Sequence, residues 1–332
     1  MSMSRRVLLV TPASPYPVVT NGCARLVSDY ERHLFPDDDV SLLVTRPGDW
    51  EPLALYHHGE VVAAPLDGAH FDFALFIGFK DTDLTRRLAS ERPSFCLTDT
   101  FPHPDVPRRL FHGILSHRCS AEDLGTSEPE DVLVVGGSYD DDVFFPARGP
   151  QELVVAVGRI HPDKNQLALV SRYRETVFAE YGLPLLLVGG VEDDAYWNAL
   201  ARHVDGVAVR ATVDPRDPSG PGSWRSAREI AALCNRARLF VSASPKESFG
   251  MALVEAMACG TTCVVDGAYG GFPGGELASR VYGNVTGSRD EIIDLTARAL
   301  EEDVRVDSSA WARQYSLRAT RAAVSRFVDA RL

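Results

Sequence analysis

Short apolar segments alternate with helical patterns along nearly the whole chain, and this alternation limits the possible fold more than any other sequence feature. Runs rich in Val, Ile, Leu and Phe predict strands, and the longer amphipathic runs between them predict helices. Such alternation favours parallel sheets with helices on both faces. The predicted strands are Val7–Val10, Val40–Val44, Phe73–Ile77, Ser94–Leu97 and Val132–Val135 in the first half, then Leu153–Val157, Leu185–Val188, Val207–Val209, Leu239–Val241 and Thr262–Val265.

The alternation breaks near residue 140. Asp140, Asp141 and Asp142 are followed by a segment rich in Pro and Gly up to Pro150, which is typical of a linker. A chain of 332 residues is also long for a single hydrophobic core. We therefore expect an α/β protein with one Rossmann-like doubly wound domain over residues 1–146, a second over 151–310, and a final helix over 311–332.

The most informative stretch runs from Phe240 to Gly260, where an apolar strand passes through a Ser/Pro turn into a helix. Glu247 lies at the predicted helix start and Glu255 inside the helix. With a helical rise of about 1.5 Å per residue, their backbones would lie about 12 Å apart, too far to act on one atom. The free N–H groups of residues 249–251 at a helix start favour oxygens or anions. The segment therefore predicts a site for the two ends of one elongated ligand, although two solvated glutamates on an amphipathic helix would give a similar spacing.

Two cations follow the first predicted strand of the second half. Arg159 and Lys164 flank a turn between the strand that ends at Gly158 and the next helix. Ligands of open α/β sheets bind beyond the carboxyl ends of the strands. Arg can chelate phosphate oxygens, and Lys adds a point charge. The pair therefore predicts a diphosphate site, against the alternative of two surface cations at helix ends.

Together these segments resemble a known family. The string from Glu247 to Ala256, with Phe249 and Gly250 inside it, and the Gly-Arg…Lys-Asn string from Gly158 to Asn165 are similar to the signatures of retaining GT-B glycosyltransferases, family 4 (glycosyl transferases group 1). The resemblance implies two Rossmann-like domains facing a cleft, with the C-terminal helix crossing back to the first domain. It covers residues 150–330 by motif and the first half mainly by topology.

The resemblance also implies roles for the residues of the second domain. Arg159 and Lys164 would hold the diphosphate of a nucleotide sugar, and Glu255 the ribose. Glu247, with the amides of Phe249, Gly250 and Met251, would hold the donor sugar. The reaction would need no metal, and the leaving phosphate would take the acceptor's proton on the front face. A Gly-rich turn with Glu276, at residues 266–276, is also similar to the family.

The first domain matches the family less well. Gly22, before a predicted helix, stands where the family carries two adjacent glycines, and here Asn21 precedes it. The family's catalytic histidine is absent from the strand end after Leu97. Asp99 and His103 are the candidates to take its place and act on the sugar or the acceptor. The run Asp140–Asp142 suggests the metal-binding motif of another glycosyltransferase fold, but its context does not support that function, and we interpret Asp37–Asp39 as a solvated turn.

Charge, hydropathy and cysteine spacing argue against a nucleic-acid binder, a membrane-spanning protein and a disulfide-linked protein. The net charge of −12 argues against a nucleic-acid binder and gives no sign of a broad cationic face for anionic membranes. The longest N-terminal apolar run ends at Pro12, too short to span a membrane, so we expect a cytoplasmic protein, either a monomer or a homodimer. The six cysteines form no CxxC pair, so the cysteine pattern supports neither zinc nor a disulfide framework.

The sequence thus predicts a retaining, metal-independent glycosyltransferase that moves a hexose-type sugar from a UDP- or GDP-linked donor to an acceptor hydroxyl and uses no further cofactor. Two alternatives stay open. A nucleotide-sugar epimerase on the same fold would also need the diphosphate site, but it would carry acid and base groups around the sugar. A non-catalytic sugar-nucleotide-binding partner subunit would fit the missing histidine.

Overall fold

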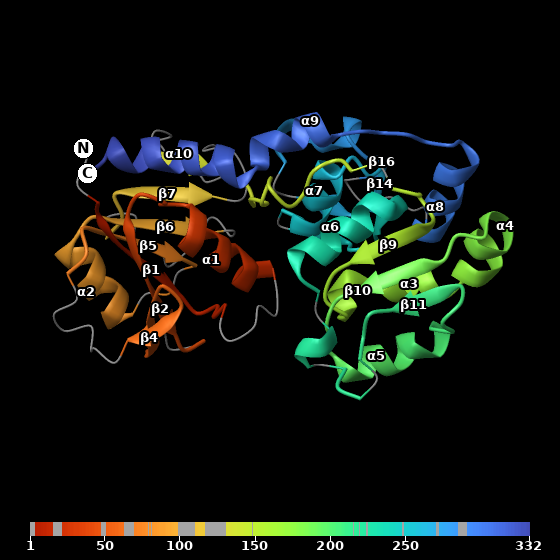
Figure 1. Cartoon of the computed structure of the whole chain (residues 1–332), viewed down its shortest axis with the longest axis horizontal. Coiled ribbons are helices and arrows are strands. Elements are labelled where there is room, and N and C mark those ends of the chain that lie inside the picture. Colours follow the sequence, from red (N-terminus) through yellow and green to blue (C-terminus); the bar gives the residue numbers. More distant parts are fainter. Residues whose placement is uncertain are drawn as a thin grey trace. The chain divides into compact units, whose positions relative to one another are not determined.

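The computed structural model describes residues 4–15, 22–47, 51–62, 70–78, 80, 82–98, 110–116, 131–147, 149–214, 216–218, 220–223, 225–247, 249–269, 272–284 and 291–332. The chain divides into two compact units (Figure 1). The first comprises Met1–Ser138 together with Leu317–Leu332, and the second comprises Tyr139–Ser316. Each unit is built around its own sheet.

The first unit contains an eight-stranded sheet in the order β4-β3-β2-β1-β5-β6-β7-β8. Pairing is parallel from β2 to β8, and β3 and β4 add an antiparallel edge. Its strands are β1 (Arg6–Thr11), β2 (Asp39–Thr45), β3 (Pro52–His57), β4 (Glu60–Val62), β5 (Phe73–Ile77), β6 (Ser94–Thr98), β7 (Gly113–Ser116) and β8 (Val132–Val134). Its helices are α1 (Gly22–His33), α2 (Asp83–Glu91) and α10 (Leu317–Asp329).

The central strands of this sheet are buried on both faces, which explains their uninterrupted apolar sequences. In β1, Val7 and Leu9 enter one hydrophobic cluster, whereas Leu8 and Val10 enter another. The alternation follows from the two-residue period of a strand. The parallel α/β architecture expected from the sequence is therefore present in this unit.

Asp38 and Asp39 do not form the solvated turn that we expected. The side chain of Asp38 is only 8% exposed, and its carboxylate accepts hydrogen bonds from the backbone N–H and the guanidinium of Arg5. Asp39 is the first residue of β2 and pairs with Arg6 of β1. The prediction failed because a run of three acidic residues hid the start of a paired strand.

The second unit contains a six-stranded parallel sheet in the order β11-β10-β9-β12-β14-β16. Its strands are β9 (Leu153–Val157), β10 (Leu185–Val188), β11 (Val209–Ala211), β12 (Ala237–Ser242), β14 (Cys263–Asp266) and β16 (Tyr282–Asn284). The two-residue strands β13 (Lys246–Glu247) and β15 (Ala268–Tyr269) pair separately. The helices are α3 (Gln166–Val170), α4 (Ala179–Tyr181), α5 (Asp194–Leu200), α6 (Ala227–Arg236), α7 (Met251–Ala258), α8 (Ile292–Glu301) and α9 (Ser309–Ala312), with a π-helical turn at Arg174–Phe178. Short 3₁₀ turns lie at Pro162–Lys164, Ala201–His203, Pro221–Ser223, Pro273–Ser279 and Arg313–Tyr315.

Helices cover both faces of this second sheet. Val155 and Phe240 pack in the hydrophobic cluster that contains the buried face of α7, whereas Val154 and Leu239 pack in the cluster that contains α8. Helix α6 begins with a reciprocal capping box, in which Ser226 and Glu229 each accept from the other's backbone N–H. Because β9 and β12 pair directly as parallel strands, their carboxyl ends lie next to each other.

The boundaries between the two units differ from the domain boundaries that we predicted from the sequence. Tyr139 and Phe144 belong to the hydrophobic core of the second unit, so that unit begins before residue 146. The expected final helix is two helices, α9 and α10, separated by the 3₁₀ turn Arg313–Tyr315. Trp311 packs on Phe272 of the second unit, and only α10 belongs to the first.

Helix α10 is anchored in the first unit by aromatic contacts. The ring of Phe327 lies 6.3 Å from that of Phe95, centroid to centroid, and it occupies the space that a side chain at Gly113 would need. Figure 1 shows this helix beside β7, a strand far from it in the sequence. In the part of the chain that the structure describes, no helix combines the length and the apolar character needed to cross a bilayer.

Candidate functional site

Two of the predicted site residues contact each other directly. Lys164, in the 3₁₀ turn Pro162–Lys164 after β9, donates to Glu247 of β13 with Nζ 2.5 Å from Oε1. The side chains are 20% and 18% exposed, so each charge is neutralised by the other at a partly buried position. Because β9 and β12 are neighbouring parallel strands, the turns that follow them meet at one edge of the sheet. This edge is where ligands of open α/β sheets bind.

A buried serine holds these two turns together. The hydroxyl of Ser244 lies 3.1 Å from the backbone oxygen of Asp163 and 3.3 Å from that of Lys246, the residues just before Lys164 and Glu247. Ser244 is 2% exposed, and a hydrogen bond at such a position is costly to lose. In the sequence Ser244 is only one serine of a Ser/Pro turn, and nothing there indicates that it links the two turns.

The backbone of Gly267 also closes on Ser244. A Cβ atom at residue 267 would lie 1.9 Å from the carbonyl oxygen of Ser244, which no real side chain tolerates. Just beyond Gly267, β15 pairs with β13, so part of the predicted Gly-rich turn lies beside Glu247. Residues 270 and 271 of that turn lie outside the described residues, and Glu276 is exposed.

Arg159 is held by a different acidic residue. Its guanidinium donates to Glu192 with Nη1 2.6 Å from Oε2, and its carbonyl accepts from Nε2 of Gln166 at 2.6 Å. Gln166 is buried at the start of α3. Each of the two predicted cations therefore pairs with a carboxylate, Arg159 with Glu192 and Lys164 with Glu247. Glu192 and Gln166 were not predicted as site residues, because neither contact follows from the spacing of residues in the sequence.

The helix after Glu247 starts later than the sequence predicted. Gly250 has a left-handed backbone, with φ 85° and ψ 64°, and α7 begins at Met251. A residue with a side chain would be strained in that conformation. Glu247 therefore belongs to β13, and the distance of about 12 Å expected for a continuous helix does not apply.

Phe249 and Met251, on either side of Gly250, differ in burial. Phe249 is buried and stacks on Phe272, with ring centroids 4.8 Å apart, so it anchors the segment in the core. Met251 is half-buried at the helix start, and the N-cap residue of α7 is Gly250, which has no side chain to cap it. The first N–H groups of the helix are thus near Glu247 in the sequence, and the N-cap residue itself cannot satisfy them, which favours ligand oxygens at this helix start.

Glu255 lies on the buried face of α7 and is 1% exposed. The pKa of the Cys234 thiol is raised by its hydrogen bond to Cys259, by burial and by the charge of Cys259, and the charge of Glu255 adds to these causes. The structure thus places this carboxylate within the second unit's interior. Its contact with a ribose stays a prediction.

The candidates of the first unit lie in or beside segments outside the described residues. Asp99 and His103 lie outside the described residues. Gly22 is the first residue of α1, and residues 16–21 before it also lie outside the described part. The site that the structure defines therefore belongs to the second unit.

Comparison with known families agrees with this location. Residues 151–296 match the family described as Glycosyl transferases group 1. The second unit carries a glycosyl transferases group 1 domain. Lys164, Glu247 and Glu255 all lie within the matched segment of this domain.

Curated relatives match a similar share of the chain. The D-inositol 3-phosphate glycosyltransferase of Segniliparus rotundus is 33% identical over 163 residues, which are 44% of this chain and 34% of the relative. The enzyme of that name from Mycobacterium tuberculosis H37Ra is 30% identical over 188 residues, 52% of this chain and 37% of the relative. The matched part thus spans about a third of the length of these relatives.

Solved structures resemble the whole chain. HepE of Anabaena in complex with UDP has a TM-score of 0.68 at 14% identity, covering 98% of this chain and 100% of HepE. A glycosyltransferase of Rickettsia africae has a TM-score of 0.65 at 12% identity, covering 98% of each chain. Sucrose-phosphate synthase of Thermosynechococcus elongatus has a TM-score of 0.62 at 14% identity, covering 97% and 94%. Together with the two parallel-sheet units, these likenesses show the GT-B fold.

Proposed function

We propose that this protein is a retaining glycosyltransferase that moves a hexose-type sugar from a UDP-linked donor to an acceptor hydroxyl. The group 1 domain supports a glycosyltransferase, and the UDP bound by HepE, a protein of the same fold, supports the choice of UDP over other nucleotides. The observation that carries the proposal is the contact between Lys164 and Glu247 beyond the ends of β9 and β12. It joins, in one place, a cation for phosphate and a carboxylate for sugar hydroxyls.

In this proposal the cations stabilise the leaving group. The bond between the sugar's anomeric carbon and the diphosphate oxygen breaks, and the departing UDP gains negative charge. Lys164 and Arg159 follow the same strand, β9, and a positive charge aimed at that oxygen lowers the barrier. Because the protein supplies this positive charge, the reaction needs no metal ion.

The acceptor attacks from the face on which UDP leaves. Its hydroxyl oxygen forms the new bond to the anomeric carbon, and its proton passes to the departing phosphate oxygen. The configuration at the anomeric carbon is then retained without a protein nucleophile. Asp99 and His103 are the proposed first-unit residues for orienting the acceptor or polarising the sugar.

The remaining second-unit residues orient the donor. Glu247 accepts hydrogen bonds from sugar hydroxyls, and the amides of Phe249, Gly250 and Met251 donate to sugar oxygens. Since Lys164 already fixes the Glu247 carboxylate at 2.5 Å, the carboxylate is oriented by a contact within the protein itself. Glu255 holds the ribose, and Gly22 allows the backbone of the first unit to approach the phosphates.

The proposal is tested by donor turnover and product stereochemistry. The protein is incubated with UDP-glucose, UDP-galactose or UDP-N-acetylglucosamine and a panel of sugar and inositol acceptors, with EDTA present, and UDP release is measured. We expect release with one donor and a product whose anomeric configuration, read by proton NMR, equals that of the donor. An inverted product or an absolute need for added metal would contradict the mechanism. A nucleotide sugar epimerised without an acceptor would favour the epimerase alternative.

A further inference from the structure

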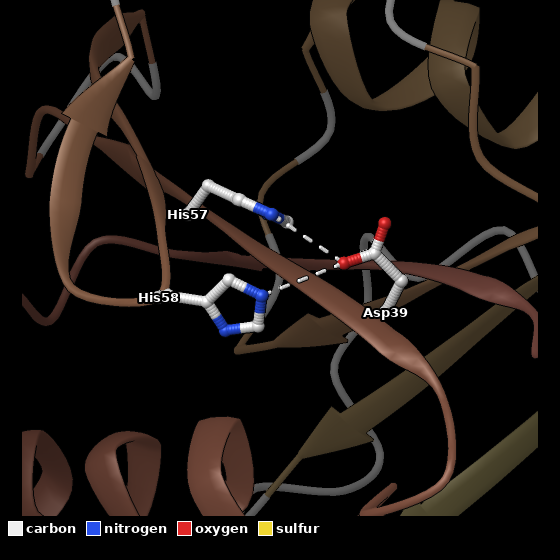
Figure 2. Close-up of side chains that lie close together, drawn as sticks. All are labelled: Asp39, His57 and His58. Atoms are coloured by element: carbon white, nitrogen blue, oxygen red, sulfur yellow. Dashed lines mark ion pairs between the residues drawn. The ribbon is translucent and has the colours of Figure 1, made fainter.

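A second group of chemically reactive side chains lies in the first unit, far in sequence from the donor residues. Asp39 at the start of β2, His57 at the end of β3 and His58 in the following turn each offer one atom, and these atoms lie within 4.8 Å of one another. Figure 2 shows the two imidazole rings directed at the same carboxylate. Among the described residues, no other group of three or more His, Cys, Asp or Glu residues meets this distance criterion.

The β3–β4 turn brings the two adjacent histidines to one place. Successive side chains of a strand point to opposite faces, so neighbouring histidines within a strand could not share a ligand. His58 instead has φ 50° and is followed by Gly59 with φ 81°, as in the tight two-residue turn between antiparallel strands. A left-handed histidine is uncommon and costs energy, and here that conformation lets its ring approach Asp39 (Figure 2).

A serine orients one of the rings. Nδ1 of His57 lies 3.1 Å from the hydroxyl of Ser41, the residue opposite it in the β2–β3 pairing. When Nδ1–H donates to Ser41, the lone pair of Nε2 faces Asp39. Histidines that bind metals are commonly held in this way by a partner at the second ring nitrogen.

The distances fit a small metal ion. Nε2 of His57 lies 3.5 Å and Nε2 of His58 3.9 Å from Oδ1 of Asp39. Ligand atoms about 2.0–2.1 Å from a tetrahedral zinc ion lie about 3.3 Å apart. Small side-chain rotations would therefore bring all three groups onto one ion, with water in a fourth position.

We propose that Asp39, His57 and His58 form a binding site for a divalent transition metal ion of the zinc class. Two imidazoles and one carboxylate suit zinc, cobalt or nickel, whereas magnesium and calcium prefer oxygen ligands alone. The ion links β2 to the β3–β4 hairpin, whose second strand is exposed along its whole length. This hairpin buries little apolar surface of its own, so a metal link stabilises the edge of the sheet.

The site is independent of the proposed transferase function. Its residues belong to the first unit, whereas Lys164 and Glu247 belong to the second. Zinc binding and UDP binding can therefore be measured and lost separately. A protein without glycosyltransferase activity could still bind zinc at this site, and a protein that does not bind zinc could still transfer a sugar.

Calorimetric titration with ZnCl₂ and with MgCl₂ tests the site. The full chain is first freed of metal by a chelator and dialysed. We expect saturable binding of about one zinc ion per chain and no binding of magnesium. His58→Asn keeps a residue that tolerates the left-handed turn. This variant and the separate variant Asp39→Asn should each weaken zinc binding by about tenfold or more. His70→Asn, at an exposed histidine outside the group, should bind zinc as the native protein does.

A cobalt titration distinguishes these ligands from cysteine. Co²⁺ bound by nitrogen and oxygen should give d–d absorption without a thiolate charge-transfer band. His57→Ala should abolish this d–d absorption. Circular dichroism checks that each variant is folded. The proposal is overturned by an absence of saturable zinc binding, by equal zinc affinity in His58→Asn and the native chain, or by a thiolate band.

Discussion

Lys164 and Glu247 are separated by 83 positions in the sequence, yet the Lys164 ammonium lies 2.5 Å from a Glu247 carboxylate oxygen. The contact joins the two sequence motifs that separately pointed to a nucleotide-sugar donor. It arises because β9 and β12 are adjacent parallel strands and both motifs follow the ends of these strands.

Glu247→Gln should separate sugar binding from nucleotide binding. If Glu247 contacts the sugar, the amide should leave the affinity for UDP within a few fold and lower the affinity for the UDP-sugar. A lost hydrogen bond to a charged group costs about 1.5–3 kcal/mol, or a tenfold loss or more. Calorimetric titration with UDP and with the UDP-sugar measures both. Equal losses for the two ligands would contradict a sugar contact.

Ser244→Ala should loosen the donor site more than it destabilises the fold. The substitution removes the hydroxyl that bridges Asp163 and Lys246, at an expected cost of about 1 kcal/mol. Lys164 and Glu247 would then be less well fixed, so KM for the donor should rise. Urea denaturation and donor kinetics measure the two effects. Ser171→Ala, at an exposed serine, is the control, and an unchanged KM in Ser244→Ala would refute the positioning function.

Gly267→Ala should destabilise the second unit strongly. Its Cβ would lie 1.9 Å from the Ser244 carbonyl oxygen, so the backbone must move, which typically costs about 1–3 kcal/mol. Gly182→Ala is a matched control because a Cβ at residue 182 meets nothing within 4 Å, although its φ of 65° adds strain. We expect a lower midpoint of urea unfolding for Gly267→Ala than for Gly182→Ala. The reverse order would show that the contact is not as tight as the structure has it.

Alkaline pH should weaken the fold through buried tyrosines. Burial raises the pKa of Tyr30, Tyr139 and Tyr315 from 10.0 to about 12 in each case. Between these values an unfolded tyrosine loses its proton while the folded one keeps it, so stability is present below pH 10 and falls as the pH rises toward 12. For the fully buried Tyr30 the loss approaches roughly 2–3 kcal/mol.

Urea unfolding at pH 9 and at pH 11 checks this effect. Tyr30→Phe removes one ionisable hydroxyl and should therefore lose less stability between the two pH values than the native chain does. Tyr56→Phe, at a half-buried tyrosine, is the control. An identical pH dependence in Tyr30→Phe and the native protein would show that Tyr30 does not contribute.

The sequence predicted the buried strands well. Phe73–Ile77, Leu153–Val157 and Leu185–Val188 have the bounds that their apolar runs indicated. These strands are covered on both faces, so the hydrophobic effect alone marks them in the sequence. The edge strands β3 and β4 carry exposed side chains and mixed composition, and no such signal was available.

Contacts across the chain were predictable only where a family pattern or strand order implied them. Lys164 and Glu247 were both expected at a donor site, but their ion pair depends on the turns that follow two strands. Ser244 resembles any other turn serine until the backbone of Asp163 is placed beside it. The approach of His58 to Asp39 depends on an antiparallel hairpin and a left-handed turn that local sequence did not reveal.

The most direct test of the donor site is calorimetric titration of UDP, in buffer with EDTA, into the native protein, Lys164→Ala and Lys246→Ala. Lys246 is the neighbouring exposed lysine and controls for the general loss of positive charge. The account predicts UDP binding by the native protein and by Lys246→Ala, and a loss of about tenfold or more in Lys164→Ala. Equal UDP affinity in all three proteins, or no binding by any, would contradict a donor site at Lys164 and Glu247.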